Sequence, residues 1–164
     1  MVVPRKSTGG QQAPRQQIAA TVARVASATH WLPKVSRLMV PVDKVVTMEP
    51  EGSIVRAMNL MATHKIGTVV VTKEPRAMPI GVVTERNIVD AYRRKLGSNC
   101  CVESVMDRNI PRIKGTSDRD EAAVKFRKNN IPYLFVVDDN HNFAGFITSW
   151  DITTACASDQ DKRY

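Results

Sequence analysis

The feature of this sequence that most constrains its fold is an internal duplication. Three short segments recur in the same order, at offsets of 67, 65 and 64 residues. The matched segments are Ser36–Met39 with Glu103–Met106, Ile66 with Ile131, and Gly81–Asn87 with Gly145–Asp151. Because all three keep their order along the chain, coincidence is a poor explanation, and the sequence predicts a tandem repeat.

Each copy has the same predicted order of elements. A helix is expected after Ser53 in the first copy and after Asp118 in the second, because both side chains are good N-caps. Two strands joined by a polar turn follow, and the second strand runs into another helix at Thr84 or Thr148. The apolar residues at helical spacing are Ile54, Ala57, Met58 and Met61 in the first copy and Ala122, Ala123 and Phe126 in the second.

A repeat of about 60 residues with this pattern cannot bury its own apolar face. The sequence therefore predicts an α/β fold in which the two copies pack sheet against sheet. The apolar fraction of 43% is typical of a soluble protein. No run approaches 18 apolar residues, so no membrane span is expected.

The positive charge of the chain is concentrated in an N-terminal extension, residues 1–33. No acidic residue precedes Asp43, whereas the chain from Asp43 onward has 18 basic and 16 acidic residues. An acid-free, amphipathic start is typical of a transit peptide, which would place the protein in the mitochondrion or another organelle. A disordered basic tail on a cytoplasmic protein fits equally well. Nucleic-acid binding is disfavoured, because the body is near neutral and only 5% of the residues are aromatic.

Two motifs carry a family resemblance. The sequence His64–Gly67 that leads into the first strand, and the Gly-x-x-Thr-x-x-Asp/Asn ending of each copy, resemble the CBS (cystathionine-β-synthase) domain. The resemblance covers residues 34–156. It implies two tandem CBS repeats, each a short β-sheet flanked by helices, packed with pseudo-twofold symmetry. The implied boundaries are 34–97 and 98–157, with a tail at 158–164.

The resemblance also implies a function. Stand-alone CBS pairs of this kind are non-catalytic regulatory modules that bind AMP, ADP, ATP or S-adenosylmethionine and transmit occupancy to a partner protein, as homodimers. The adenine nucleotide would be a regulatory ligand and no cofactor would be obligatory. A constitutive dimerisation or interaction module with degenerate pockets is the alternative. An enzyme is not expected, because no nucleophile–base pair or metal-ligand spacing is present.

The candidate binding residues lie where each second strand meets its helix. Thr84 and Thr148 begin helices whose free N–H groups favour phosphate, although a Thr-x-x-Asp sequence also serves as a helix cap. By the resemblance, the Asp151 carboxylate binds ribose hydroxyls and Arg86 adds charge against a phosphate, while Asn87 is a neutral counterpart of Asp151. One occupied site is expected, in the second copy. The residues whose backbone groups are implied to contact adenine are Val46, Thr47, Ile66 and Gly67 in the first copy and Ile113, Ile131 and Pro132 in the second.

Overall fold

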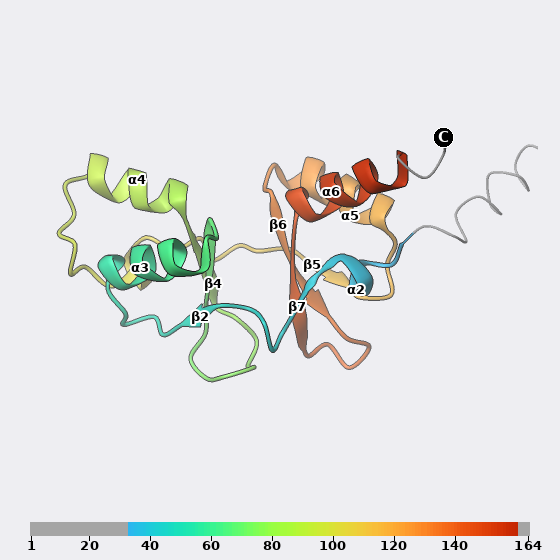
Figure 1. Cartoon of the computed structure of the whole chain (residues 1–164). Coiled ribbons are helices and arrows are strands. Elements are labelled where there is room, and N and C mark those ends of the chain that lie inside the picture. The colour runs from blue at the N-terminus through green and yellow to red at the C-terminus, as the bar shows by residue number, and fades with distance from the viewer. Residues whose placement is uncertain (1–32, 161–164) are drawn as a thin grey trace, which may run out of the picture. The chain divides into compact units, whose positions relative to one another are not determined.

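The computed structural model describes residues 33–160, with side chains up to residue 157 (Figure 1). The extension at 1–32 and the last residues, 161–164, lie outside this range. The helices are α2 (Val35–Leu38), α3 (Ile54–His64), α4 (Glu85–Arg93), the 3-10 helix η2 (Val102–Ser104), α5 (Arg119–Asn129) and α6 (Ser149–Gln160). The strands are β1 (Val40–Pro41), β2 (Thr47–Met48), β3 (Thr68–Val71), β4 (Gly81–Thr84), β5 (Arg112–Lys114), β6 (Tyr133–Val137) and β7 (Phe143–Thr148). None of the described helices has the length and apolar character needed to cross a membrane.

The strands form two sheets that repeat one topology. One sheet has the order β2-β3-β4 and the other β1-β7-β6-β5. In each, a short strand runs parallel to the first arm of an antiparallel hairpin. Thr68 pairs with Thr84 at one end of the first hairpin, and Tyr133 pairs with Thr148 at the same end of the second. The duplication in sequence is therefore a duplication in structure.

The predicted helix starts are confirmed. The Ser53 and Asp118 side chains each accept a hydrogen bond from the backbone N–H three residues on, at 3.2 and 3.3 Å, and so cap α3 and α5. The predicted apolar face of α5 is wrong at one position. Ala122 and Phe126 are buried, but Ala123 is exposed, because its place on the helix surface points away from the sheet.

The segment that opens each repeat packs on the sheet of the other repeat. Helix α2 and strand β1 belong by sequence to the first copy, yet β1 pairs with β7 and Val35 is fully buried in the core of the second copy. In the same way, Val102 of η2 is fully buried in the core of the first copy. Asp107 then exchanges two backbone hydrogen bonds of 2.9 Å with Val82. The two repeats thus complete each other's cores.

A third apolar cluster joins the two sheets. It combines Val70 and Val82 of the first sheet with Phe135, Phe146 and Tyr133 of the second. The expected packing of sheet against sheet is thereby confirmed. Because both strand-to-helix junctions leave their sheets at this contact, the interface brings them to a common cavity.

Candidate functional site

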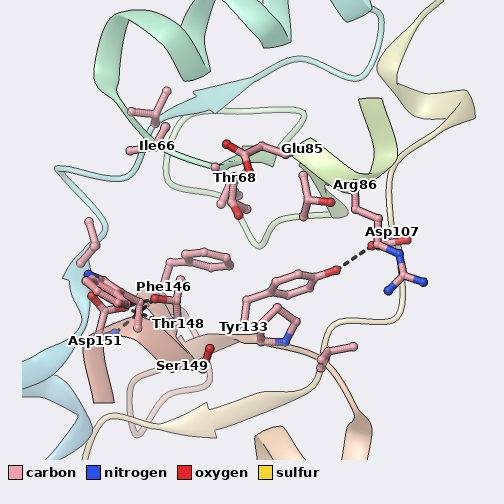
Figure 2. A pocket seen from close by; sticks show the side chains of 18 of the residues that line it. Ile66, Thr68, Glu85, Arg86, Asp107, Tyr133, Phe146, Thr148, Ser149 and Asp151 are labelled. Atoms are coloured by element: carbon pink, nitrogen blue, oxygen red, sulfur yellow. Dashed lines mark hydrogen bonds between the residues drawn. The ribbon is translucent and has the colours of Figure 1, made fainter. Parts of the chain in front are cut away.

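A cavity of about 950 Å³ lies between the two repeats. The first turns of α4 and α6 both line it, each with the threonine that precedes the helix. Figure 2 shows Thr148 and Asp151 on one side of the cavity and Arg86 on the other. The structure therefore brings the two predicted sites into one space.

Both threonines act as helix caps. The backbone N–H and the hydroxyl of Thr84 each donate to Oδ1 of Asn87 at 2.7 Å. Thr148 makes the same two bonds to Oδ2 of Asp151, also at 2.7 Å. The threonine oxygens in turn accept from the backbone N–H groups of Asn87 and Asp151 at 3.3 and 3.4 Å. The capping role that the sequence allowed is thus present in both copies.

The caps leave chemically different atoms unbonded in the two copies. Within residues 33–160, Oδ1 of Asp151 accepts no hydrogen bond, and Nδ2 of Asn87 donates none. The second copy therefore offers the cavity an anionic acceptor, while the first offers a neutral donor. An ionised acceptor forms stronger hydrogen bonds with hydroxyl groups than a neutral group does.

The helix N-termini also retain donors for an anion. The first amide of α4 donates to the carbonyl of Gly67 at 3.1 Å, and that of α6 donates to Pro132 at 2.8 Å. The next backbone amides, those of Arg86 and Trp150, have no hydrogen-bond partner among the described residues. Unpaired amides at the start of a helix, with the helix dipole behind them, favour a phosphate or carboxylate.

Ten of the twelve residues predicted from the sequence line the cavity, and two do not. The ten are Val46, Ile66, Gly67, Thr84, Arg86, Asn87, Ile131, Pro132, Thr148 and Asp151. Thr47 instead lines a smaller cavity of about 210 Å³ beside the first hairpin loop, because successive residues of a strand face opposite sides. Ile113 is only 1% exposed, packs in the core of the second repeat and does not line the cavity.

Tyr133 also lines the cavity and was not among the residues predicted from the sequence. The Tyr133 hydroxyl donates to Oδ2 of Asp107 at 2.6 Å, as the dashed line in Figure 2 shows. Burial raises the pKa of Tyr133 well above its usual range, and the bond to Asp107 raises it further. The available signal was the register, since Tyr133 occupies the place in β6 that Thr68 has in β3.

Comparison with known proteins identifies the repeated unit. The model of the CBS domain matches residues 35–94 and, a second time, residues 102–158. This chain belongs to the CBS domain family. The predicted fold, two tandem CBS repeats in an α/β arrangement, is confirmed.

Relatives of this CBS pair include enzymes and isolated CBS pairs. Inosine-5'-monophosphate dehydrogenase of Thermoplasma acidophilum is 36% identical over 110 residues, which are 67% of this chain but 21% of the enzyme. A CBS domain protein of Pyrobaculum aerophilum, complexed with AMP, is 25% identical with a TM-score of 0.65 and covers 76% of this chain and 98% of its own. The CBS domain pair of protein MJ0100, in complex with 5'-methylthioadenosine and S-adenosyl-L-methionine, has the same identity and TM-score, over 74% and 98%. The chain spans about one-fifth of the length of two such dehydrogenases and 56% of an uncharacterized protein of Methanopyrus kandleri that is 29% identical to it.

Proposed function

We propose that this CBS pair is a non-catalytic regulatory module that binds an adenosine ligand in the cavity and transmits its occupancy to a partner protein. The observation that carries the proposal is the free Oδ1 of Asp151 in a cavity that both capped helix N-termini line. The ligand classes are AMP, ADP, ATP and S-adenosylmethionine. AMP and S-adenosylmethionine are bound in CBS structures that are 25% identical to this chain.

Each part of an adenosine ligand has a chemical counterpart in the cavity. Asp151 would accept from the ribose hydroxyls through Oδ1. The apolar side chains of Val46 and Ile66 would flank the adenine, and the free amides at the helix starts would bind a phosphate. Lys44, which also lines the cavity, adds a positive charge for phosphate. The ligand would regulate, and no cofactor would be obligatory.

Occupancy of the cavity would be transmitted through a change in the relative orientation of the two repeats. A ligand that contacts both can shift their arrangement only by the difference in its affinity for the two states. A contact surface for a client protein or a second copy is offered by α4, where Val89 and Tyr92 are 68% and 60% exposed. We propose that the protein is a homodimer.

The alternative is a constitutive dimerisation or interaction module whose cavity binds nothing. Two observations favour it: the neutral Asn87 in the first copy and the exposed apolar residues of α4. Thermal unfolding with AMP, ADP, ATP and S-adenosylmethionine separates the two functions, with guanosine monophosphate as a control. A ligand at one hundred times its Kd adds about 2.7 kcal/mol to the free energy of unfolding. A dimer by light scattering that none of the four adenosine ligands stabilises would favour the alternative.

We also propose that the N-terminal extension targets the protein to the mitochondrion or another organelle. The support is its composition, which lacks acidic residues. Deleting residues 1–32 should abolish import of a fluorescent fusion and leave the thermal unfolding temperature of the purified CBS pair unchanged. Import that survives the deletion would contradict a targeting role.

A further inference from the structure

The cavity has two halves that strand pairing defines. Val40 pairs with Phe146, two residues before Thr148, so it belongs to the half at the start of α6, the α6 half. Asp107 pairs with Val82, two residues before Thr84, so it belongs to the half at the start of α4, the α4 half. Val40 and Asp107 therefore occupy matching places in the two halves, and both line the cavity.

The two halves differ most at a pair of equivalent residues, Thr68 and Tyr133. Both are the first residues of their hairpins, paired with Thr84 and Thr148 respectively. The Tyr133 side chain extends away from its own repeat and reaches Asp107 in the α4 half, beside Arg86 (Figure 2). In the matching place the α6 half has the short side chain of Thr68. An aromatic ring thus occupies space in the α4 half that stays open in the α6 half.

The Tyr133 ring is held firmly. Its side chain is only 5% exposed, and its ring stacks on that of Phe146 with centroids 6.1 Å apart. The hydroxyl bond to Asp107 is 2.6 Å long, and Asp107 is itself fixed by its two backbone bonds to Val82. A tyrosine hydroxyl is protonated at neutral pH and can donate this bond, and the raised pKa of Tyr133 extends that range to higher pH. Moving the ring aside would break the bond and the stacking together.

Charge does not distinguish the two halves. Asp107 places a carboxylate in the α4 half where the α6 half has the apolar Val40, but Asp151 places one in the α6 half where the α4 half has Asn87. The obstruction of the α4 half therefore rests on the Tyr133 ring.

We infer that Tyr133, anchored by Asp107, occludes the α4 half of the cavity, so that this CBS pair binds a single adenosine ligand per chain, in the α6 half. The inference rests on the proposed function. It makes Tyr133 a residue that determines the stoichiometry, through a side chain that itself lines the cavity.

Isothermal titration of the full chain with AMP tests the inference. The wild type should bind one equivalent, and Tyr133→Thr, which copies Thr68 into the second repeat, should bind two. Tyr133→Phe keeps the ring and is the matched control, with one equivalent expected. The reciprocal double change, Thr68→Tyr with Val40→Asp, should obstruct the α6 half and weaken AMP binding at least tenfold.

The number of AMP molecules bound per chain decides the inference. Two equivalents in the wild type, or one in a folded Tyr133→Thr variant, would overturn it and leave the proposed function standing. If Tyr133→Thr does not fold, unchanged AMP affinity in the Thr68→Tyr, Val40→Asp variant would overturn it instead. A wild type and a Tyr133→Thr variant that both fail to bind AMP, ADP, ATP and S-adenosylmethionine would refute the proposed function itself.

Discussion

Replacing Asp151 with Asn separates the charge of this carboxylate from its role in the helix cap. Replacement by Ala would remove both, because Oδ2 of Asp151 also accepts two bonds of 2.7 Å from Thr148. The chain itself shows that an amide supports the same cap, since Oδ1 of Asn87 accepts the equivalent bonds at the same distance. Asp151→Asn should therefore leave the start of α6 intact and change only the group that faces the ligand.

The magnitude follows from the strength of the bond to ribose. A hydrogen bond to a charged group contributes about 1.5–3 kcal/mol and a neutral one about 0.5–1.5 kcal/mol. The loss of the charge should thus cost about 1 kcal/mol or somewhat more, which is roughly a five- to tenfold loss of affinity. The reciprocal variant Asn87→Asp should leave AMP affinity unchanged, because Tyr133 obstructs that half of the cavity.

Calorimetric titration measures the affinity for AMP, and thermal unfolding of the unliganded variants measures the stability that the helix cap supports. We expect Asp151→Asn to unfold at the wild-type temperature and to bind AMP more weakly. Wild-type affinity in this variant would show that the Asp151 carboxylate does not contact the ligand. A lowered unfolding temperature would show instead that the cap needs the charge.

Three further predictions follow from the structure. Val35→Ala removes two buried methyl groups from the core of the second repeat and should lower the free energy of unfolding, measured in urea, by about 2 kcal/mol. A negligible change would mean that α2 contributes little to the stability of the second repeat. Because folding raises the pKa of Tyr133, the native state keeps this proton to a higher pH than the unfolded chain, and the free energy of unfolding should fall as the pH rises above about 10. Tyr133→Phe should lose that part of the pH dependence. The same pH profile in this variant would contradict the role given to the Tyr133 hydroxyl. AMP in the α6 half should slow hydrogen exchange at 148–152 by direct contact, and at 84–88 and in the linker 95–99 through the altered arrangement of the repeats. Protection of 148–152 alone would indicate binding without transmission.

Much of the fold could be predicted because its signals are local. N-caps such as Ser53 and Asp118 mark helix starts within one helical turn, and short continuous apolar runs, at 68–71 and 133–137, mark strands. The threonine junctions were predicted as sites on the same basis. The duplication then predicted that the two copies share one topology and pack sheet against sheet, without any knowledge of long-range contacts.

The features that could not be predicted depend on contacts between residues far apart in sequence. The bond from Tyr133 to Asp107 spans 26 residues, and nothing near either residue indicates it. The placement of Thr47 and Ile113 depends on which face of a two- or three-residue strand meets the cavity, and strands this short give no reliable alternation. The packing of α2 on the second repeat likewise required the three-dimensional contact.

The reciprocal packing of the opening segments has a consequence for dissecting the protein. A fragment of residues 33–97 would keep α2, whose binding surface lies in the second repeat, and would lack the Val102 side chain that fills its own core. A fragment of residues 98–160 would keep η2, whose binding surface lies in the first repeat, and would lack the Val35 side chain that fills its own core. Neither half is an autonomous folding unit, so the two should denature in one cooperative transition. Co-expressed halves should fold only when they reassociate, which makes this chain a natural scaffold for a split-protein reporter.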